Sequence, residues 1–216
     1  MLKNGDVVID LYHENPAPDF GQLKAAGVAG VFLKASQGMA AWDEWFSATA
    51  KAVSDAGLEI GAYCFVDPAV SPMAQVHAFL DTVEQSGTVC GLGLAYDIEP
   101  CMHGGIDKWR TLTGNQASAY VRQLIRYTNV QVNAQLTVYA SPSFWQETIC
   151  NPCDSTEDGY RQDAMTNVRS WIAAYRFDEP EQLESFSGNP WLWQYTESGK
   201  TVGFDGDADL SRVISA

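Results

Sequence analysis

The sequence predicts an α/β fold: a single-domain, irregular β/α barrel of the TIM type, with about five β-α units followed by three strands that lack full helices. Three observations predict it. Short β-branched or aromatic runs alternate with segments of helical period. Glycines directly follow several of the helical segments, as C-caps do. Toward the C-terminus the helical segments fade while strand-like runs continue, and a parallel sheet built this way is expected to close as a barrel.

Each expected strand is a run of β-branched, aromatic or other apolar residues of strand length. In chain order the strands are Val7–Leu11, Val28–Ala35, Leu58–Val66, Leu92–Ile98, Leu136–Ala140, Ser170–Tyr175, Trp191–Tyr195 and Phe204–Leu210. Each expected helix has apolar residues three and four apart, which places them on one face. In chain order the helices are Asp19–Ala26, Trp42–Ala56, Met73–Glu84, Thr113–Asn129 and the short Pro142–Ile149. Thr113 or Asn115 can cap the fourth helix, and the polar segment Cys150–Val168 is expected to be a long loop.

The composition excludes several classes of protein. The chain has 216 residues, is 46% apolar and 12% aromatic, and carries Lys+Arg 13 against Asp+Glu 27, a formal net charge of −14. The apolar content is too high for a disordered chain. No run of about 18 apolar residues is present to span a membrane, and no cluster of Lys and Arg is present to bind nucleic acid. Residues 1–216 contain no linker or repeat, so we interpret them as one domain and expect a monomer.

The N-terminal sequence MLKNGDVVIDLYHEN has neither an apolar core nor a small-residue cleavage site. No secretory signal is therefore expected. Either the protein is made in the cytoplasm and released by another route, or this is a mature or recombinant chain.

Two carboxylates end the fourth strand, in the sequence Tyr-Asp-Ile-Glu-Pro. Asp97 and Glu99 are two residues apart, so a strand places them on one face with Cα atoms about 6.6 Å apart. Like charges this close raise one pKa, which a general acid working near neutral pH requires. The alternative is an ordinary solvated strand end.

Two further acids are expected at the same rim. Asp10 lies near the end of the first strand and Asp209 near the end of the last. The first and eighth strands are neighbours in a closed barrel, so these two side chains should meet and face Asp97 and Glu99. Four acids in one pocket are costly to hold together unless they do chemistry or bind a cation.

Aromatic residues also occur toward this rim: Tyr63, Tyr139, Tyr175, Trp191, Trp193 and Tyr195. Aromatic faces can stack on sugar rings while Tyr and Trp still form hydrogen bonds. For any single aromatic residue, a place in the core is the simpler interpretation. In the seventh strand, Trp193 and Gln194 are on opposite faces, so only one of the two faces can point into the barrel.

Five cysteines leave at least one unpaired thiol in a monomer. Cys64 and Cys90 sit in or beside apolar runs and are expected to be buried thiols. Four groups of the kind that bind zinc lie in loop-like sequence: Cys101, His103, Cys150 and Cys153. A surface disulfide or free thiols are the simpler alternatives, and we predict no metal or cofactor.

The sequence resembles glycoside hydrolase family 25, the Chalaropsis-type lysozymes that include phage endolysins. The resemblance spans nearly the whole chain in the family's order. It is carried by VVIDLYH (7–13), GVFLKASQG (30–38), AGLEIGAYCF (56–65), LAYDIEP (94–100), LTVYASPSFW (136–145), WIAAY (171–175), WLWQYT (191–196) and DADL (207–210).

The resemblance implies a β/α barrel that hydrolyses the β-1,4 bond between N-acetylmuramic acid and N-acetylglucosamine, with the glycan strands of peptidoglycan as partner. It implies Glu99 as proton donor, Asp97 as its partner, and Asp10 and Asp209 as the remaining pocket acids. The matching motifs and the rim aromatics together indicate these substrate-binding residues: Lys34, Gln37, Tyr63, Tyr139, Tyr175, Trp193 and Gln194.

Two positions depart from the family pattern. Gln37 stands where the family often has Glu, and Cys64 where it usually has His. These two departures affect the expected identity of the substrate more than the expected type of reaction, because all four pocket acids are present.

The second catalytic role has two candidate routes. Asp97 could attack the anomeric carbon, or the substrate's 2-acetamido group could attack while Asp97 orients it; both routes retain configuration. We favour the second, because N-acetylated sugars supply that group. Competing interpretations are a sugar-binding barrel without catalysis, a related glycosidase for another N-acetylated glycan, and a cation-binding carboxylate site. The intact set of acids favours hydrolysis.

Overall fold

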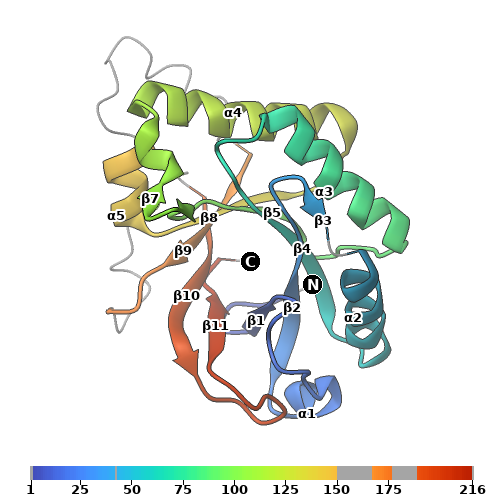
Figure 1. The fold of residues 1–216 in the computed structure, drawn as a ribbon. Helices are drawn as coiled ribbons and strands as arrows, with labels where there is room; N and C mark the ends of the chain where they lie inside the picture. The colour runs from blue at the N-terminus through green and yellow to red at the C-terminus, as the bar shows by residue number, and fades with distance from the viewer. Residues whose placement is uncertain (1, 42, 150–166, 177–188, 216) are drawn as a thin grey trace.

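Strand pairing closes the sheet into a barrel (Figure 1). The computed structural model describes residues 2–41, 43–149, 167–176 and 189–215. Within that part of the chain the strands run in the order β1-β11-β10-β9-β8-β5-β4-β2, and β1 pairs with β2 as well, so the ring is complete. This confirms the predicted barrel. Its strands are β1 (Val7–Leu11), β2 (Val28–Gln37), β4 (Glu59–Phe65), β5 (Gly93–Asp97), β8 (Leu136–Ala140), β9 (Arg169–Ala173), β10 (Pro190–Gly199) and β11 (Ala208–Val213).

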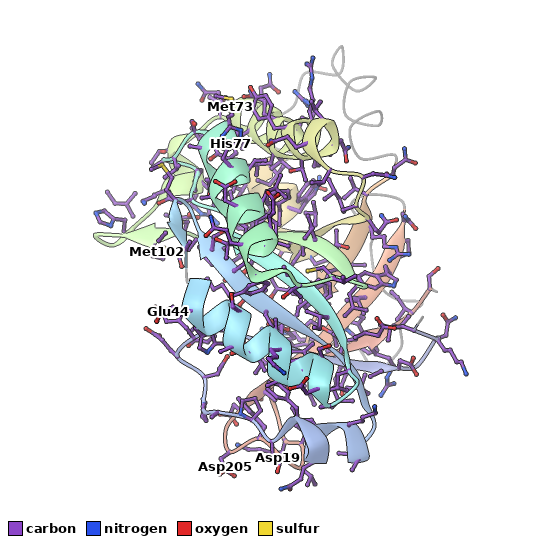
Figure 2. All side chains as sticks on the ribbon, turned by 90° about the vertical axis from the view of Figure 1, so that its right-hand side faces the viewer. Asp19, Glu44, Met73, His77, Met102 and Asp205 are labelled. Atoms are coloured by element: carbon purple, nitrogen blue, oxygen red, sulfur yellow. The ribbon has the colours of Figure 1, made fainter. Side chains whose placement is uncertain are left out.

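Helices cover the outside of the barrel next to the strands of the first half of the chain, and α2 and α3 lie on the face turned to the viewer in Figure 2. Thr113 caps α4 in a capping box with Gln116, which confirms Thr113 as a cap. None of the helices in the described residues is both long and apolar enough to cross a bilayer. The helices are α1 (Phe20–Ala25), α2 (Asp43–Asp55), α3 (Pro72–Ser86), α4 (Gly114–Gln131) and α5 (Pro142–Phe144), with a 3-10 turn at Lys108–Thr111 and a π-helical turn at Trp145–Ile149.

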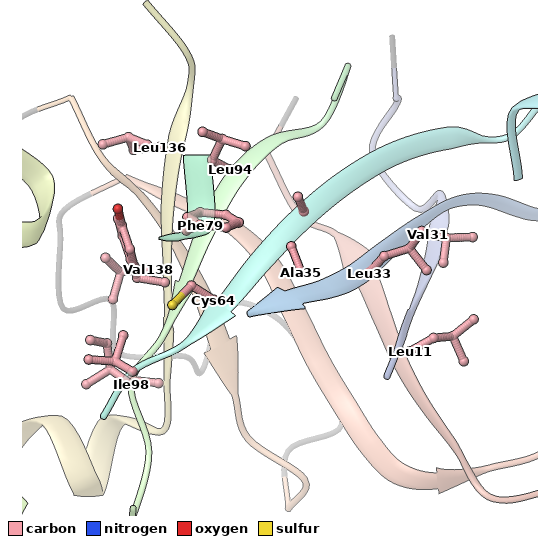
Figure 3. Packing of buried hydrophobic residues seen from close by; sticks show 14 of the residues in the cluster. Leu11, Val31, Leu33, Ala35, Cys64, Phe79, Leu94, Ile98, Leu136 and Val138 are labelled. Atoms are coloured by element: carbon pink, nitrogen blue, oxygen red, sulfur yellow. The ribbon is translucent and has the colours of Figure 1, made fainter. Parts of the chain in front are cut away.

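Alternation along the strands divides the core into two layers. The outward-facing side chains, such as Leu33, Cys64 and Val138, pack between the sheet and the helices (Figure 3). The inward-facing side chains, such as Phe32 and Trp171, form a second cluster that fills the barrel. Toward one end of the barrel, polar side chains replace the apolar ones and line a cavity.

The last strand is the main correction to the predicted fold. We expected a parallel strand over Phe204–Leu210, but β11 covers Ala208–Val213 and is antiparallel to both β10 and β1. Asp209 therefore lies near the start of its strand. The reversal brings it to the same rim as the carboxyl ends of the parallel strands.

Two short hairpins at the rim were missed by the sequence analysis. β3 (Ala40–Ala41) folds back on β2, and β6 (Met102–His103) pairs with β7 (Ile106–Asp107). Pairs of two-residue strands carry too little periodicity to be recognised. The second hairpin projects from the body of the molecule at Met102 (Figure 2).

The two ends of the described chain meet at the opposite end of the barrel (Figure 1). The backbone N–H of Gly5 donates to the carbonyl oxygen of Val213 at 2.8 Å, and the N–H of Val213 donates to the carbonyl of Asp6 at 3.0 Å. These bonds extend the β1–β11 ladder past the start of β1.

One glycine allows the aromatic filling of the barrel. A Cβ atom on Gly61 would lie 2.2 Å from the Phe32 ring, which is fully buried. The same ring packs against Trp171 and Trp191, with centroid distances of 4.8 and 6.1 Å, so it has no room to move aside.

We therefore expect Gly61→Ala to lower the free energy of unfolding by about 1–3 kcal/mol, the usual cost of overpacking a core. Chemical denaturation followed by circular dichroism measures it. Gly21→Ala, on the exposed helix α1 with its nearest neighbour atom at 3.3 Å, is the matched control and should change stability by less than about 1 kcal/mol. Equal effects of the two substitutions would contradict the packing argument.

Candidate active site

A cavity of about 310 Å³ occupies the carboxyl end of the parallel strands. Its charged lining consists of Asp10, Lys34, Asp97, Glu99, Glu197 and Asp209, so all four acids expected from the sequence reach it. Tyr63, Tyr139 and Tyr175 line it too, as expected. The four acids come from three strands, and the closure of the barrel brings them together.

Strand β5, the fourth barrel strand in chain order, positions two of the acids. Asp97 is the last residue of β5, and Ile98 between the two acids packs outward into the core. The carbonyl of Asp97 accepts from the N–H of Val66 at 3.0 Å, and the N–H of Ile98 donates to the carbonyl of Tyr139 at 2.9 Å. The ladder thus continues on both sides past the end of the strand, and it holds Asp97 and Glu99 on the cavity face.

Asp10 and Asp209 are direct partners across the antiparallel β1–β11 ladder. Burial raises the pKa of Asp10 well above its usual range, and the neighbouring Asp209 raises it further. Burial and the charge of Glu197 raise the pKa of Asp209 to about 6, while a hydrogen bond from Asp10 opposes the rise. When the pair shares one proton, Asp10 donates it and Asp209 accepts it.

Burial is also the largest cause of the raised pKa values of Asp97 and Glu99. We expected Asp97 to raise the pKa of Glu99. Instead, the acids that raise the pKa of Glu99 are Asp209 and Glu197, while Glu99 raises the pKa of Asp97.

Lys34 is the cation among the lining residues. Its Nζ donates to Oε1 of Gln37 at 2.9 Å and lies 4.6 Å from the centroid of the Phe65 ring. Burial lowers the pKa of Lys34, whereas the charges of Asp97 and Glu99 raise it. Gln37 itself is not part of the cavity lining, so its contact with the cavity is through Lys34.

Gln194 connects the acids to the aromatic wall. Its Nε2 donates to Oδ2 of Asp10 at 3.0 Å. Its Oε1 accepts from the hydroxyls of Tyr139 and Tyr175, at 2.8 and 2.7 Å. Gln194 in the middle of β10 is therefore bonded to side chains of β1, of β8 and of the segment after β9.

Trp193, expected to bind substrate, lies on the other side of the sheet. It packs with Ile172 and Ala174, and its Nε1 donates to the carbonyl of Ala174 at 2.7 Å. Since Gln194 points into the barrel, alternation turns Trp193 outward. Trp191 nonetheless reaches the interior cluster, because the register of β10 shifts between Pro190 and Leu192.

The sequence analysis missed five side chains that line the cavity: Tyr12, Phe65, Ala95, Trp171 and Glu197. Tyr12 directly follows the first strand, which is a signal that could have been used. For Glu197 strict alternation from Gln194 predicts the outward face. The register of β10 shifts on both sides of Thr196, and this irregularity turns Glu197 toward the cavity.

The possible zinc ligands are only partly described. Cys101 is a buried free cysteine and His103 is exposed in the β6–β7 hairpin, whereas Cys150 and Cys153 lie outside the described residues. Cys64 is a buried free thiol, as predicted, and Cys90 is half-buried. Among the residues that the structure describes, no three His, Cys, Asp or Glu side chains are grouped as a metal ion would require.

Comparison with known proteins gives a consistent result over nearly the whole chain. Residues 9–204 match the family model described as Glycosyl hydrolases family 25. The autolytic lysozyme of Clostridium acetobutylicum is 27% identical over 202 residues, and lysozyme M1 of Streptomyces globisporus is 25% identical over 210 residues; each match covers 94% of this chain. The chain spans 54% and 66% of the length of these two relatives.

The fold has a close counterpart among solved structures. The bacterial lysozyme from Streptomyces coelicolor superposes with a TM-score of 0.78 at 22% identity, over 98% of this chain and 93% of that chain. At this level of identity the likeness is evidence for the barrel fold alone.

The raised pKa of Asp209 predicts how stability depends on pH. Its pKa is about 6 in the folded chain and 3.8 ordinarily, so the folded state binds more protons between these pH values. Stability should therefore fall as pH rises from about 4 to about 6. We expect Asp209→Asn to flatten this decline and to raise the Tm at pH 7, as measured by thermal denaturation across the range.

The matched control is Asp207→Asn, two residues earlier on an exposed site where Asp207 pairs with Lys200 at 2.7 Å. It should leave the shape of the pH dependence unchanged, because a surface ion pair contributes little. If the plot of Tm against pH for Asp209→Asn runs parallel to that of the unchanged protein, the pKa of Asp209 is not raised by folding.

Proposed function

The chain belongs to glycosyl hydrolases family 25, and from that membership we propose that it is a peptidoglycan hydrolase of the lysozyme type. The reaction would be hydrolysis of the β-1,4 bond between N-acetylmuramic acid and N-acetylglucosamine. One observation carries the proposal for this chain: Asp97 and Glu99, both with raised pKa values, line one cavity together with several aromatic side chains. A protonated carboxyl beside a second carboxyl is the minimum equipment for cleaving a glycosidic bond.

Glu99 is the proton donor in this proposal. Burial raises its pKa, and the like charges of Asp209 and Glu197 raise it further, while Lys34 opposes them. A carboxyl with a raised pKa keeps its proton to higher pH, and it can protonate the leaving oxygen as the bond breaks.

Asp97 would then act on the sugar whose bond breaks. Its Oδ1 is buried and has no hydrogen-bond partner within the described protein. A buried carboxylate oxygen without a donor is costly, and the N–H of a 2-acetamido group would satisfy it. This favours the route in which the acetamido oxygen attacks the anomeric carbon and Asp97 holds the group in place, with retention of configuration.

The walls of the cavity suit a sugar chain. Tyr12 and Phe65 flank the Lys34 ammonium, at 5.7 and 4.6 Å from their ring centroids, and they offer apolar faces beside a hydrogen-bond donor. Sugar rings combine an apolar face with polar edges, so this mixture matches them. We propose glycan strands of the bacterial cell wall as the partner, in keeping with relatives that are named an autolytic lysozyme and lysozyme M1.

The first experiment is Glu99→Gln on isolated peptidoglycan. We expect turnover to fall about 10²–10⁴-fold, the usual contribution of a positioned general acid, with the Tm and circular dichroism spectrum unchanged. Release of soluble fragments measures turnover, and their masses identify the bond that is cut. More than a tenth of the original turnover would show that Glu99 is not the donor.

The control is Glu44→Gln, a similar substitution at an exposed position of α2 (Figure 2), which should leave turnover unchanged. The same assay in EDTA separates the cation interpretation from ours, since protonation needs no metal. Activity that disappeared in EDTA and returned with calcium or zinc would favour a cation site. A chain that bound the glycan without any turnover would be a binding module.

The two routes differ in the intermediate. If the acetamido group attacks, a thiazoline sugar that mimics the resulting bicyclic ion should be a competitive inhibitor. A 2-fluoro glycoside, which lacks the acetamido group, should leave no adduct on the protein when intact mass is measured. A stable glycosyl adduct on Asp97 would instead establish direct attack by that carboxylate.

A further inference from the structure

Lys34 supplies the one positive charge among the described residues that line the cavity, against five acids. Its side chain is 9% exposed, and its charge lowers the pKa values of Asp97 and Glu99 against the effect of burial. A buried charge acts more strongly on its neighbours than an exposed one, because salt and water screen it less. The charge of Lys34 therefore bears directly on the two acids to which the reaction is assigned.

A neutral group holds the Lys34 ammonium in place. Nζ donates to Oε1 of Gln37 at 2.9 Å, and the ring centroids of Phe65 and Tyr12 lie 4.6 and 5.7 Å away. An amide oxygen accepts a hydrogen bond but carries no net charge. The contact with Gln37 thus fixes the position of Nζ without cancelling its charge.

The other charges near this contact are exposed, neutral or paired. The titratable groups that act on Lys34 are, in decreasing order of effect, Asp97, Glu99, Cys64 and Glu14. Glu14 is 71% exposed, so water weakens its effect. Burial raises the pKa of the Cys64 thiol to about 12, so this thiol is neutral at pH 7. Past the end of β4, Asp67 forms an ion pair with Lys108 at 2.6 Å. The charge of Lys34 therefore acts mainly on the two acids at the end of β5.

We propose that Gln37 is a positioning residue for the hydrolysis: it fixes the Lys34 charge beside Asp97 and Glu99 and, being neutral, leaves that charge to act on them. The inference rests on the lysozyme-type function proposed above and concerns the pH range of the same site. Gln37 lies outside the cavity lining and acts through Lys34. A carboxylate in its place would form an ion pair with Lys34 and cancel most of the effect of the ammonium on the two acids.

Gln37→Glu tests the importance of the neutral oxygen. The two side chains have the same length, so a carboxylate oxygen can accept from Nζ where the amide oxygen did. The added negative charge should raise both apparent pKa values of the Asp97 and Glu99 pair. Both limbs of the pH–rate profile on peptidoglycan should then move to higher pH, by about one unit.

Gln37→Met separates the charge from the contact. This variant stays neutral but offers Nζ no strong acceptor, so the ammonium should turn toward the two carboxylates. Both limbs should then move the other way, to lower pH, by about half a unit. The matched control is Met39→Glu, which adds the same charge two residues further on, at a side chain that is 63% exposed. Its profile should move by less than about 0.2 unit, because solvent screens the new charge.

A second measurement does not depend on turnover. Protein labelled with 13C at the side-chain carboxyl carbons reports the titration of Asp97 and Glu99 by NMR, and the spectrum of Glu99→Gln assigns the Glu99 signal. Each variant should show the same direction of shift in this titration as in the pH–rate profile. The titration also decides the matter for a variant that has lost activity at every pH.

Three results would overturn the inference. The first is an unchanged titration of the two acids in Gln37→Glu. The second is an equal shift in Met39→Glu, which would show an effect of net charge without the contact to Lys34. The third is a shift in the same direction in Gln37→Met and Gln37→Glu, which would show a merely structural role. If the unchanged protein does not hydrolyse peptidoglycan, the proposed function fails; if it does and the profile of Gln37→Glu stays in place, this inference alone fails.

Discussion

Strand β1 forms hydrogen bonds on both of its edges, in parallel with β2 and antiparallel with β11, and the cavity depends on these two ladders. The ladder with β11 joins the first strand of the described chain to the last. The antiparallel ladder places Asp10 opposite Asp209, and the parallel one places Phe32 of the barrel filling beside Asp10. Without closure the acids of β1 and β5 would lie in different parts of an open sheet. The backbone hydrogen bonds of these ladders thus hold the acids close together despite their like charges.

The four buried acids lower the stability of the folded barrel. Burial raises the pKa values of Asp10, Asp97, Glu99 and Asp209. The ionised form of each carboxyl is therefore less stable here than in water. The charge of Lys34 offsets part of the repulsion on Asp97 and Glu99, and a hydrogen bond from Asp10 to Asp209 offsets part of the repulsion in the other pair. The packed aromatic layer beneath the cavity keeps the strands from spreading under that repulsion. The packing of the aromatic cluster inside the barrel therefore supports the arrangement of the acids at the rim.

Much of this could be predicted from the sequence, because the relevant signals are local. The apolar runs located the strands of the first half closely, and the spacing of Asp97 and Glu99 fixed their common face. Other features depend on contacts between distant segments. The direction of β11 follows from its pairing with β1, and the inward turn of Glu197 follows from an irregular register in β10. Neither leaves a periodic pattern, so Glu197 was missed. Trp193 was assigned to the wrong side of the sheet because alternation alone does not say which face of β10 points into the barrel.

The bonds between Gly5, Asp6 and Val213 have a topological consequence. They hold the two ends of the described chain side by side at the end of the barrel opposite the cavity. A linker of a few residues would connect them, and the ring of strands would then have no natural beginning. Such a circular permutant could be reopened at a distant surface turn, for instance after α3 at Gly87, with every strand of the ring still intact. The order in which the strands are synthesised is thus separable from the order in which they pair.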